Sequence, residues 1–334
     1  MKSDAIMRKK GRLPMNNEKK VLLRCEHLVK EYPMDRKRRV HAISDISLEI
    51  YEGECLALVG ESGCGKSTLG RALIQLHKPT AGKVFYKEKE ITSMSAKEFA
   101  PYRREMQMIF QDPYASLDPR MNVHDIIAEP LVTYKVCNNK EELKEKVLEL
   151  MDAVGVPREF LYRYPHQFSG GQRQRIGIAR AIALNPSLVI CDEPVSALDV
   201  SVQSQVLNLL KEIQEKKGLA YLFISHDLSV VRFISDRVCV MFLGKVCEIG
   251  DSELIYQQPV HPYTRFLINA IPVADPKLRN VEKPLLQGEI PSPVNPPAGC
   301  RFHTRCPYAT EKCRTQEPML RQVKGRMVAC HEAE

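Results

Sequence analysis

One stretch of nine residues constrains this chain more than any other, because it fits the pattern G-x-x-x-x-G-K-[ST] of a phosphate-binding loop. A short apolar run, 55–59, precedes it, and a helical pattern of apolar residues follows and stops before Pro79. The order of strand, glycine turn and helix is the context that such a loop requires. The glycines allow a tight turn, and the helix N-terminus adds partial positive charge, so that backbone N–H groups face phosphate oxygens. The loop consists of Gly60, Glu61, Ser62, Gly63, Cys64, Gly65, Lys66, Ser67 and Thr68.

The loop predicts a site for a nucleotide with its magnesium ion. Lys66 is expected to reach the β- and γ-phosphates, and Ser67 to ligate Mg²⁺. A continuous apolar run, 188–191, is typical of a central parallel strand and ends in Asp192 and Glu193. At the end of such a strand Asp192 is expected to bind Mg²⁺, and Glu193 to polarise the attacking water.

Two more polar side chains follow predicted strands. Gln111 comes after the apolar run 106–110, and His226 after the run 221–224. Ligands of open α/β sheets bind at the carboxyl ends of the strands, where both side chains are expected to lie. Gln111 is predicted to contact Mg²⁺ or the attacking water, and His226 to hydrogen-bond the γ-phosphate.

A second glycine turn lies at the start of another predicted helix and offers a second site for an anion. Its residues are Ser169, Gly170, Gly171 and Gln172. If this turn lies far from the first loop in one subunit, it cannot easily reach the same nucleotide. A head-to-tail dimer, in which each turn covers the γ-phosphate bound by the partner, resolves this difficulty.

The composition narrows the class of protein. The 334 residues are 44% hydrophobic, which is ample for a buried core, and the net charge is +8. Basic residues gather in residues 1–20, which we expect to be a flexible tail, and in the run 36–39, which we expect to be solvated. Without an apolar stretch of roughly 18 residues or a signal-peptide core, we expect a cytosolic chain whose membrane role depends on a partner. The 11 cysteines are then expected to be free thiols or metal ligands.

Together these motifs resemble those of ATPase subunits of ABC transporters, over roughly residues 20 to 255. The matching residues are Gly60–Thr68, Gln111, Ser169–Gln172, Leu188–Glu193, Ser196-Ala197-Leu198-Asp199 and His226. The resemblance implies an α/β fold, with a P-loop core, an N-terminal antiparallel β subdomain and an inserted helical subdomain at about 112–180. It also implies that Glu193, His226 and Gln111 act in catalysis. Asp199 would lie at the dimer interface and Tyr32 would stack on adenine, whereas Phe168 replaces the leucine usual before the second turn.

The composition shifts after residue 256, where prolines become frequent, and 257–334 is expected to form a loop-rich appendage to a nucleotide-binding domain at 21–256. Its segments 261–264, 288–293 and 300–307 resemble the tails of oligopeptide and dipeptide importer ATPases. Four cysteines fall in this appendage with five, six and 16 intervening residues, which matches neither common zinc nor ferredoxin spacing. Spacing alone indicates a metal site or four free thiols. The resemblance implies a [4Fe–4S] cluster on Cys300, Cys306, Cys313 and Cys330, with Zn²⁺ as the lesser alternative.

The resemblance also implies partners. These are a second ATPase subunit (a paralogue or an identical copy), two transmembrane permease subunits and, indirectly, an extracytoplasmic peptide-binding protein. The expected location is the cytoplasmic face of the membrane, and no nucleic acid is expected. Two alternatives stay open: an importer of another solute, such as a nickel complex or a sugar, and a soluble ABC ATPase acting on nucleic acid or ribosomes. A regulatory ATP switch is disfavoured by the presence of Glu193 and His226.

Overall fold

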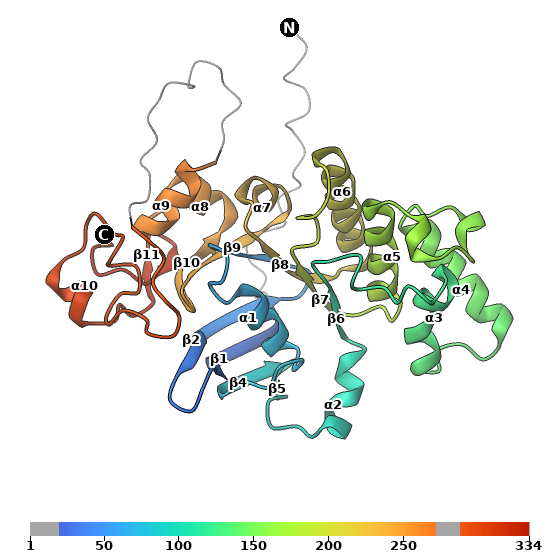
Figure 1. Ribbon diagram of the computed structural model, residues 1–334, viewed down its shortest axis with the longest axis horizontal. Helices are drawn as coiled ribbons and strands as arrows, with labels where there is room; N and C mark the ends of the chain where they lie inside the picture. The colour runs from blue at the N-terminus through green and yellow to red at the C-terminus, as the bar shows by residue number, and fades with distance from the viewer. Residues whose placement is uncertain (1–19, 272–287, 334) are drawn as a thin grey trace, which may run out of the picture.

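The computed structural model describes residues 20–271 and 288–333 (Figure 1). Apart from Lys20, the predicted basic tail lies outside these ranges, as do Pro272, Pro276 and Pro284 of the proline-bearing segment. Figure 1 shows a central core, with helices α3, α4 and α5 at one end of the molecule and α10 with the C-terminus at the other. The predicted α/β class is confirmed.

The core is built on an eight-stranded sheet in the order β11-β12-β10-β9-β3-β8-β7-β6. The strands β3, β6, β7, β8 and β9 pair in parallel, whereas β9 and β10 pair antiparallel. Every residue of β3, β7 and β8 is buried, as expected for strands covered on both faces. The bounds are β3 Cys55–Val59, β6 Met106–Ile109, β7 Leu188–Asp192, β8 Ala220–Ser225, β9 Arg237–Phe242 and β10 Lys245–Asp251.

A second, antiparallel sheet has the order β2-β1-β4-β5, which agrees with the expected N-terminal β subdomain. Its strands are β1 Val21–Pro33, β2 Arg39–Tyr51, β4 Ala81–Tyr86 and β5 Lys89–Glu90, and α2 Ala96–Arg103 follows them. Helix α1, Lys66–Leu73, packs against β1 and β2 on one side and β7 and β8 on the other. A Cβ at Gly70 would lie 2.9 Å from Ile190 Cγ2, so this glycine lets α1 approach the core sheet closely.

The helical part consists of α3 Val123–Thr133, α4 Lys140–Ala153 and α5 Gly170–Ile182, with short 3₁₀ turns at 158–160 and 165–167. Each helix begins where a side chain accepts a hydrogen bond from a free backbone N–H, at Asn122, Asn139 and Ser169. The helices bury their apolar faces against one another, and α5 also packs on β6 and on α6, Val200–Lys217. The helical part is therefore joined to the core through the edge strand β6 and helix α6.

The C-terminal region contains more regular structure than the proline pattern predicts. It includes α9 Pro262–Asn269, α10 Glu311–Thr315 and a hairpin of β11 Arg321–Val323 and β12 Arg326–Val328. Two short helices precede this region, α7 Leu228–Ile234 and α8 Ser252–Gln257. Strand β12 pairs with β10, so the hairpin extends the main sheet. Arg326, at 3.5 Å from Glu248, is fully buried and also donates to the carbonyls of Leu254 and Gln258. This ion pair and the strand pairing were not evident from the sequence.

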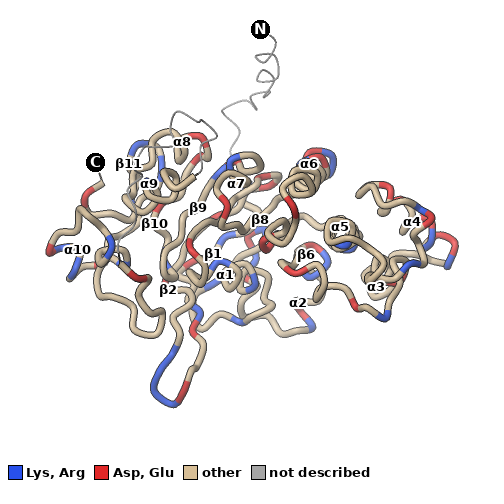
Figure 2. The backbone as a smooth tube through the Cα atoms, turned by 45° about the horizontal axis from the view of Figure 1, so that its top comes forward, with Lys and Arg blue, Asp and Glu red and all other residues tan. Residues whose placement is uncertain are grey.

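The basic residues 36–39 are exposed to solvent, as expected from the sequence. Figure 2 shows this basic run at the tip of the loop between β1 and β2, which projects away from the rest of the chain. Within the loop, Asp35 accepts hydrogen bonds from the side chain and backbone N–H of Arg38. Among the described helices, none combines the length and the apolar character that crossing a bilayer requires.

Candidate active site

The loop 60–65 connects β3 to α1. At two of its positions, the backbone conformation and the close neighbours leave room for glycine alone. Gly60 has φ +151°, and a Cβ there would lie 2.1 Å from the carbonyl oxygen of Met241. Gly65, with φ +102°, precedes α1 directly, and a Cβ there would lie 2.1 Å from the carbonyl oxygen of Ala42. The neighbouring strands therefore confine the loop at both ends, and the loop leads directly into the N-terminus of α1, where an anion is favoured.

Lys66 lies across this loop. Its Nζ donates to the carbonyl oxygens of Gly60 at 2.7 Å and Glu61 at 3.0 Å, and the residue is buried. Cys64 is buried beside it, and burial raises the pKa of the Cys64 thiol, which Lys66 partly offsets. The Cys64 thiol is therefore neutral in the folded protein.

Ser67 and Asp192, predicted as magnesium ligands, lie in direct contact. The Ser67 hydroxyl donates to Asp192 Oδ1 at 2.6 Å, and Asp192 is fully buried at the end of β7. Arg71, one helical turn beyond Ser67, donates to Asp192 Oδ2 at 3.3 Å. A hydroxyl beside a buried carboxylate fits the oxygen ligands that Mg²⁺ prefers. Sequence reasoning missed Arg71, although its position four residues after Ser67 on one helix face was a usable signal.

The three predicted catalytic residues converge on one carboxylate oxygen. Glu193 Oε2 accepts a hydrogen bond from Gln111 Nε2 at 2.9 Å and lies 3.2 Å from His226 Nδ1. Glu193 follows β7 and has φ +45°, a left-handed conformation that is uncommon outside glycine. Such local strain clusters at functional sites, where the surrounding structure maintains it. The amide, the imidazole and the carboxylate come from three neighbouring strand ends, β6, β8 and β7, as the sheet-edge argument predicts.

The second glycine turn lies in the helical part, away from the loop 60–65. Ser169 Oγ accepts from the Gln172 backbone N–H, and Gln172 Oε1 accepts from the Ser169 N–H, so the two residues cap α5 reciprocally. Gly171 faces α6, where a Cβ would lie 2.4 Å from Val202 Cγ1. Helix α5 packs on α3, α4, α6 and β6, whereas α1 packs on β1, β2, β7 and β8. The turn and the loop thus belong to different parts of the subunit.

Two further predicted residues have no bond to the loop among the described interactions. Tyr32, at the end of β1, is half-buried and shares a hydrogen bond of 2.7 Å with His77 Nδ1. Lys30 Nζ lies 4.9 Å from the centre of the Tyr32 ring. Asp199 precedes α6, and both it and the neighbouring Val200 are exposed. The roles of Tyr32 and Asp199 stay predictions.

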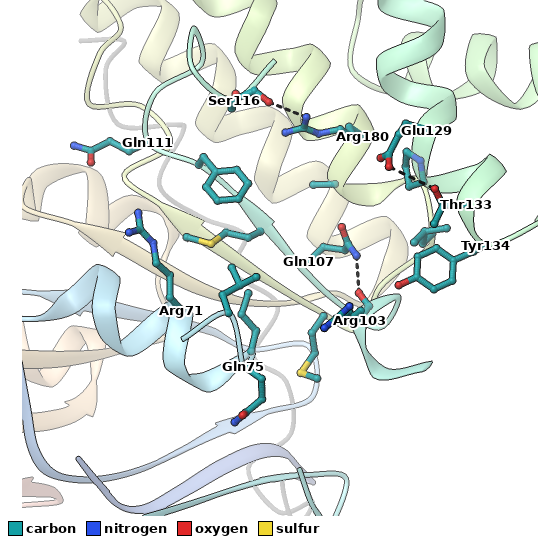
Figure 3. Close-up of a pocket in the computed structure, with 18 of the residues that line it drawn as sticks. Arg71, Gln75, Arg103, Gln107, Gln111, Ser116, Glu129, Thr133, Tyr134 and Arg180 are labelled. Atoms are coloured by element: carbon teal, nitrogen blue, oxygen red, sulfur yellow. Dashed lines mark hydrogen bonds between the residues drawn. The ribbon is translucent and has the colours of Figure 1, made fainter. Parts of the chain in front are cut away.

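A groove of about 810 Å³ separates the core from the helical part (Figure 3). It is lined by Arg71 of α1 and the residues just after that helix, by β6, and by α3 and α5, and Gln111 is among its lining residues. Arg180 crosses from α5 to donate to the Ser116 carbonyl at 2.8 Å. Gln111 therefore belongs both to this groove and to the group around Glu193.

The four cysteines of the appendage line one small cavity, of about 10 Å³, with His303, His331 and Glu332 among the other lining residues. Burial raises the pKa of Cys300 to about 11 and raises the pKa values of Cys306 and Cys330. A cavity of this size holds about one water molecule. Across residues 20–271 and 288–333, no group of three or more His, Cys, Asp or Glu side chains is arranged to hold a metal ion. The thiols of Cys300, Cys306, Cys313 and Cys330 gather, but the geometry does not support the predicted [4Fe–4S] cluster.

Comparison with known proteins identifies two family regions. Residues 43–196 match the ABC transporter family, and residues 247–313 match the C-terminal region of oligopeptide/dipeptide transporters. The solved structure of the ATP-binding cassette MJ0796, described as a dimeric post-hydrolysis state bound to ADP and Pi, superposes with a TM-score of 0.64 at 30% identity. It covers 69% of this chain and 99% of that one.

Curated relatives extend over nearly the whole chain. The oligopeptide transport ATP-binding protein OppF of Haemophilus influenzae is 48% identical over 328 residues, covering 95% of this chain and 99% of that protein. OppF of Escherichia coli is 52% identical over 294 residues, or 88% of each chain. The dipeptide transport ATP-binding protein DppF of Haemophilus influenzae is 49% identical over 325 residues, with coverage of 95% and 99%. This chain therefore belongs to the ABC transporter ATPases, in the family of oligopeptide and dipeptide transport ATP-binding subunits.

Proposed function

We propose that the protein is the ATP-hydrolysing subunit of an ABC importer for di- or oligopeptides. The observation that carries the proposal is the convergence of Gln111 and His226 on Glu193, beside the contact between Ser67 and Asp192. The relatives described above are named as oligopeptide and dipeptide transport ATP-binding proteins, which supports the cargo. The predicted domains, 21–256 for the nucleotide and 257–334 for the appendage, are part of this proposal.

In the proposed reaction, the loop Gly60–Thr68 binds the phosphates through its N–H groups and Lys66. Glu193 accepts a hydrogen bond from the attacking water and orients it toward the γ-phosphate. Gln111 and His226 both contact Glu193 Oε2, at 2.9 and 3.2 Å, and so restrict the orientation of the carboxylate that accepts this bond. Ser67 and Asp192, with Gln111, would hold Mg²⁺, which supplies positive charge to the phosphates when bound.

The proposed working unit is a head-to-tail dimer. Residues 169–172 lie in the helical part, away from the loop 60–68, and do not easily reach the nucleotide of their own subunit, so they are assigned to the nucleotide of the partner ATPase. Asp199 and Val200, both exposed at the start of α6, are placed at the same interface, and Tyr32 is placed on adenine. The related cassette MJ0796 is described as dimeric, which supports a dimer as the working unit.

The groove between the core and the helical part is the proposed contact with the transmembrane permease. It is lined by both parts, so a segment bound in it senses their relative movement. Gln111 links the groove to Glu193, which gives a physical path between the permease and the reaction. The protein would therefore work on the cytoplasmic face of the membrane.

A metal group on the appendage is a separate part of the proposal. What supports it is that Cys300, Cys306, Cys313 and Cys330 line one cavity although they are spread along the sequence. An iron and sulfide assay on protein purified without oxygen tests it. About four irons and four sulfides per chain support the cluster, stoichiometric zinc supports the lesser alternative, and four titratable thiols without metal remove both.

A transport assay tests the main function. Cells that lack the gene should lose uptake of labelled di- and oligopeptides, and the wild-type gene should restore it. Glu193→Gln should fail to restore uptake although the protein accumulates normally. Normal peptide uptake without the gene, with loss of nickel or sugar uptake instead, would redirect the cargo assignment and leave the ATPase assignment intact.

A further inference from the structure

The appendage contacts the phosphate-binding loop at a residue that the loop motif leaves free. Glu61 is one of the unspecified positions in G-x-x-x-x-G-K-[ST], so phosphate binding does not by itself require its side chain. Its backbone N–H nevertheless donates to the Tyr263 hydroxyl at 2.9 Å. Its carboxylate accepts two hydrogen bonds from Arg305 Nη1, at 2.7 and 3.1 Å. Tyr263 and Arg305 both belong to the appendage.

These partners are buried and fixed by their own surroundings. Tyr263 is fully buried, and its ring packs edge-on against Phe242 with the ring centres 4.9 Å apart. Burial raises the pKa of Tyr263, so the hydroxyl stays neutral and accepts the bond from Glu61. The Arg305 side chain is 7% exposed and that of Glu61 is 22% exposed. An ion pair so shielded from water is stronger than a surface pair and more costly to break.

The segment of the loop that contains Glu61 also contacts Lys66. Lys66 Nζ donates to the carbonyl oxygens of Gly60 and Glu61, so the backbone of Glu61 lies between Lys66 and the appendage. On the other side, Gly60 is confined by the carbonyl of Met241. A shift of Glu61 away from Tyr263 and Arg305 therefore displaces both the carbonyl that Lys66 contacts and the start of the loop.

We propose that Arg305 and Tyr263 are positioning residues for nucleotide binding, which hold the phosphate-binding loop in its binding shape through Glu61. The inference rests on the proposed function only in that a nucleotide binds the loop 60–68. It assigns to the appendage a role in the affinity of the ATP site, in addition to any role of its cysteines.

The test is isothermal titration calorimetry of the full-length protein with ADP and Mg²⁺, which avoids hydrolysis. Arg305→Met should raise the Kd for ADP roughly two- to tenfold, as expected for residues coupled by direct contact. Glu61→Gln should weaken ADP binding to a similar extent. The double variant with both Arg305→Met and Glu61→Gln should have a Kd for ADP no higher than that of either single variant. Tyr263→Phe, which keeps the buried ring, should also raise the Kd.

The sign of the Glu61→Gln effect separates positioning from simple electrostatics. Through charge alone, loss of Arg305 weakens binding of an anion and loss of Glu61 tightens it. Positioning instead predicts weaker binding in both variants, because each loses the pair. Tighter binding by Glu61→Gln, or an unchanged Kd in both Arg305→Met and Tyr263→Phe, overturns the inference.

A matched control is Arg158→Met, because Arg158 also forms a close pair, with Asp152 at 2.6 Å, but in the helical part. It should leave the Kd for ADP unchanged. Thermal unfolding of each variant separates a local change in the loop from general loss of stability. If the wild-type protein itself fails to bind ADP, the proposed function fails; if only the variants show no effect, the positioning role fails.

Discussion

Ser67 donates its hydroxyl proton to Oδ1 of Asp192 at 2.6 Å, across 125 residues of sequence. The contact joins the first turn of α1 to the end of the buried strand β7. Asp192 is fully buried, and each of its carboxylate oxygens accepts a hydrogen bond, Oδ1 from the Ser67 hydroxyl and Oδ2 from the Arg71 guanidinium at 3.3 Å. The pair is the centre of the proposed magnesium site.

The first prediction concerns this pair. Asp192→Asn keeps the shape of the side chain but removes the charge, so we expect the Mg²⁺ concentration for half-maximal ATPase activity to rise at least about tenfold, as for loss of a charged ligand. Ser67→Ala should shift it in the same direction. Titration of ATPase activity with Mg²⁺ measures both. An unchanged Mg²⁺ requirement in Asp192→Asn would contradict the assignment.

Glu193→Gln should abolish hydrolysis while leaving nucleotide binding intact. The amide cannot orient and accept a proton from water as the carboxylate does, and loss of a general base costs roughly 10²–10⁴-fold in rate. With ATP and Mg²⁺ the variant should elute from a gel-filtration column as a dimer, because the closed state no longer turns over. Turnover at the wild-type rate would remove Glu193 from its role.

Two glycines of α5 provide a matched pair for a stability test. A Cβ at Gly171 would lie 2.4 Å from Val202 Cγ1, whereas a Cβ at Gly177 would meet nothing within 4 Å. Gly171→Ala should therefore lower the free energy of unfolding by about 1–3 kcal/mol through overpacking. Gly177→Ala should raise it by about 0.5–1 kcal/mol, because alanine favours helix interiors. Urea unfolding of both variants measures the two changes in the free energy of unfolding. Equal changes in the two variants would refute the prediction.

The groove can be tested by introducing charge. Phe110 lines the groove and is partly exposed. Phe110→Asp should reduce peptide uptake by the transporter but leave ATP hydrolysis by the isolated subunit intact. A charge inside a desolvated contact costs several kcal/mol in binding the permease. Tyr162→Asp is the control, because Tyr162 is exposed on the helical part and is not among the groove residues. Equal transport losses in the two variants would argue against a specific contact.

His261 predicts how stability depends on pH. The side chain is buried within the appendage, its Nδ1 accepts a hydrogen bond from the Tyr263 N–H, and burial lowers the pKa of His261 to about 3. The unfolded chain binds a proton at about pH 6.5 and the folded chain does not, so stability falls as the pH drops below 6.5. From pH 7.5 to 5.5 this group should remove roughly 1.4 kcal/mol of unfolding free energy.

His261→Asn separates this effect from other groups, since asparagine can still accept a bond at the helix start but does not titrate. Its free energy of unfolding, measured in urea, should change less between pH 7.5 and 5.5 than that of the wild type. The same pH dependence in both proteins would assign the titration to another residue.

The sequence predicted the elements that carry the site because those elements are locally encoded. The continuous apolar runs before Asp192 and before Gly60 are short and typical of buried parallel strands, so the polar residues after them were expected at one edge of the sheet. The reciprocal cap of Ser169 and Gln172 also depends on neighbours in sequence.

Contacts between distant segments were not predictable in this way. The pairing of β12 with β10 and the burial of Arg326 against Glu248 depend on the path of the appendage, which frequent prolines made look irregular. The resemblance implied four cysteine ligands, and Cys300, Cys306, Cys313 and Cys330 do line one small cavity, but within the described ranges their side chains are not arranged as a metal-holding group. Spacing along the chain does not determine such distances.

The ion pair between Glu61 and Arg305 also sets an order of events during synthesis. Arg305 is added 244 residues after Glu61, which takes roughly 10–50 s at ribosomal rates. During that interval the emerging chain already contains the whole loop 60–68 but not the guanidinium that pairs with Glu61. If Arg305 positions the loop as proposed, a nascent cassette binds nucleotide more weakly until synthesis has passed Arg305, and only then does it compete fully for cellular ATP.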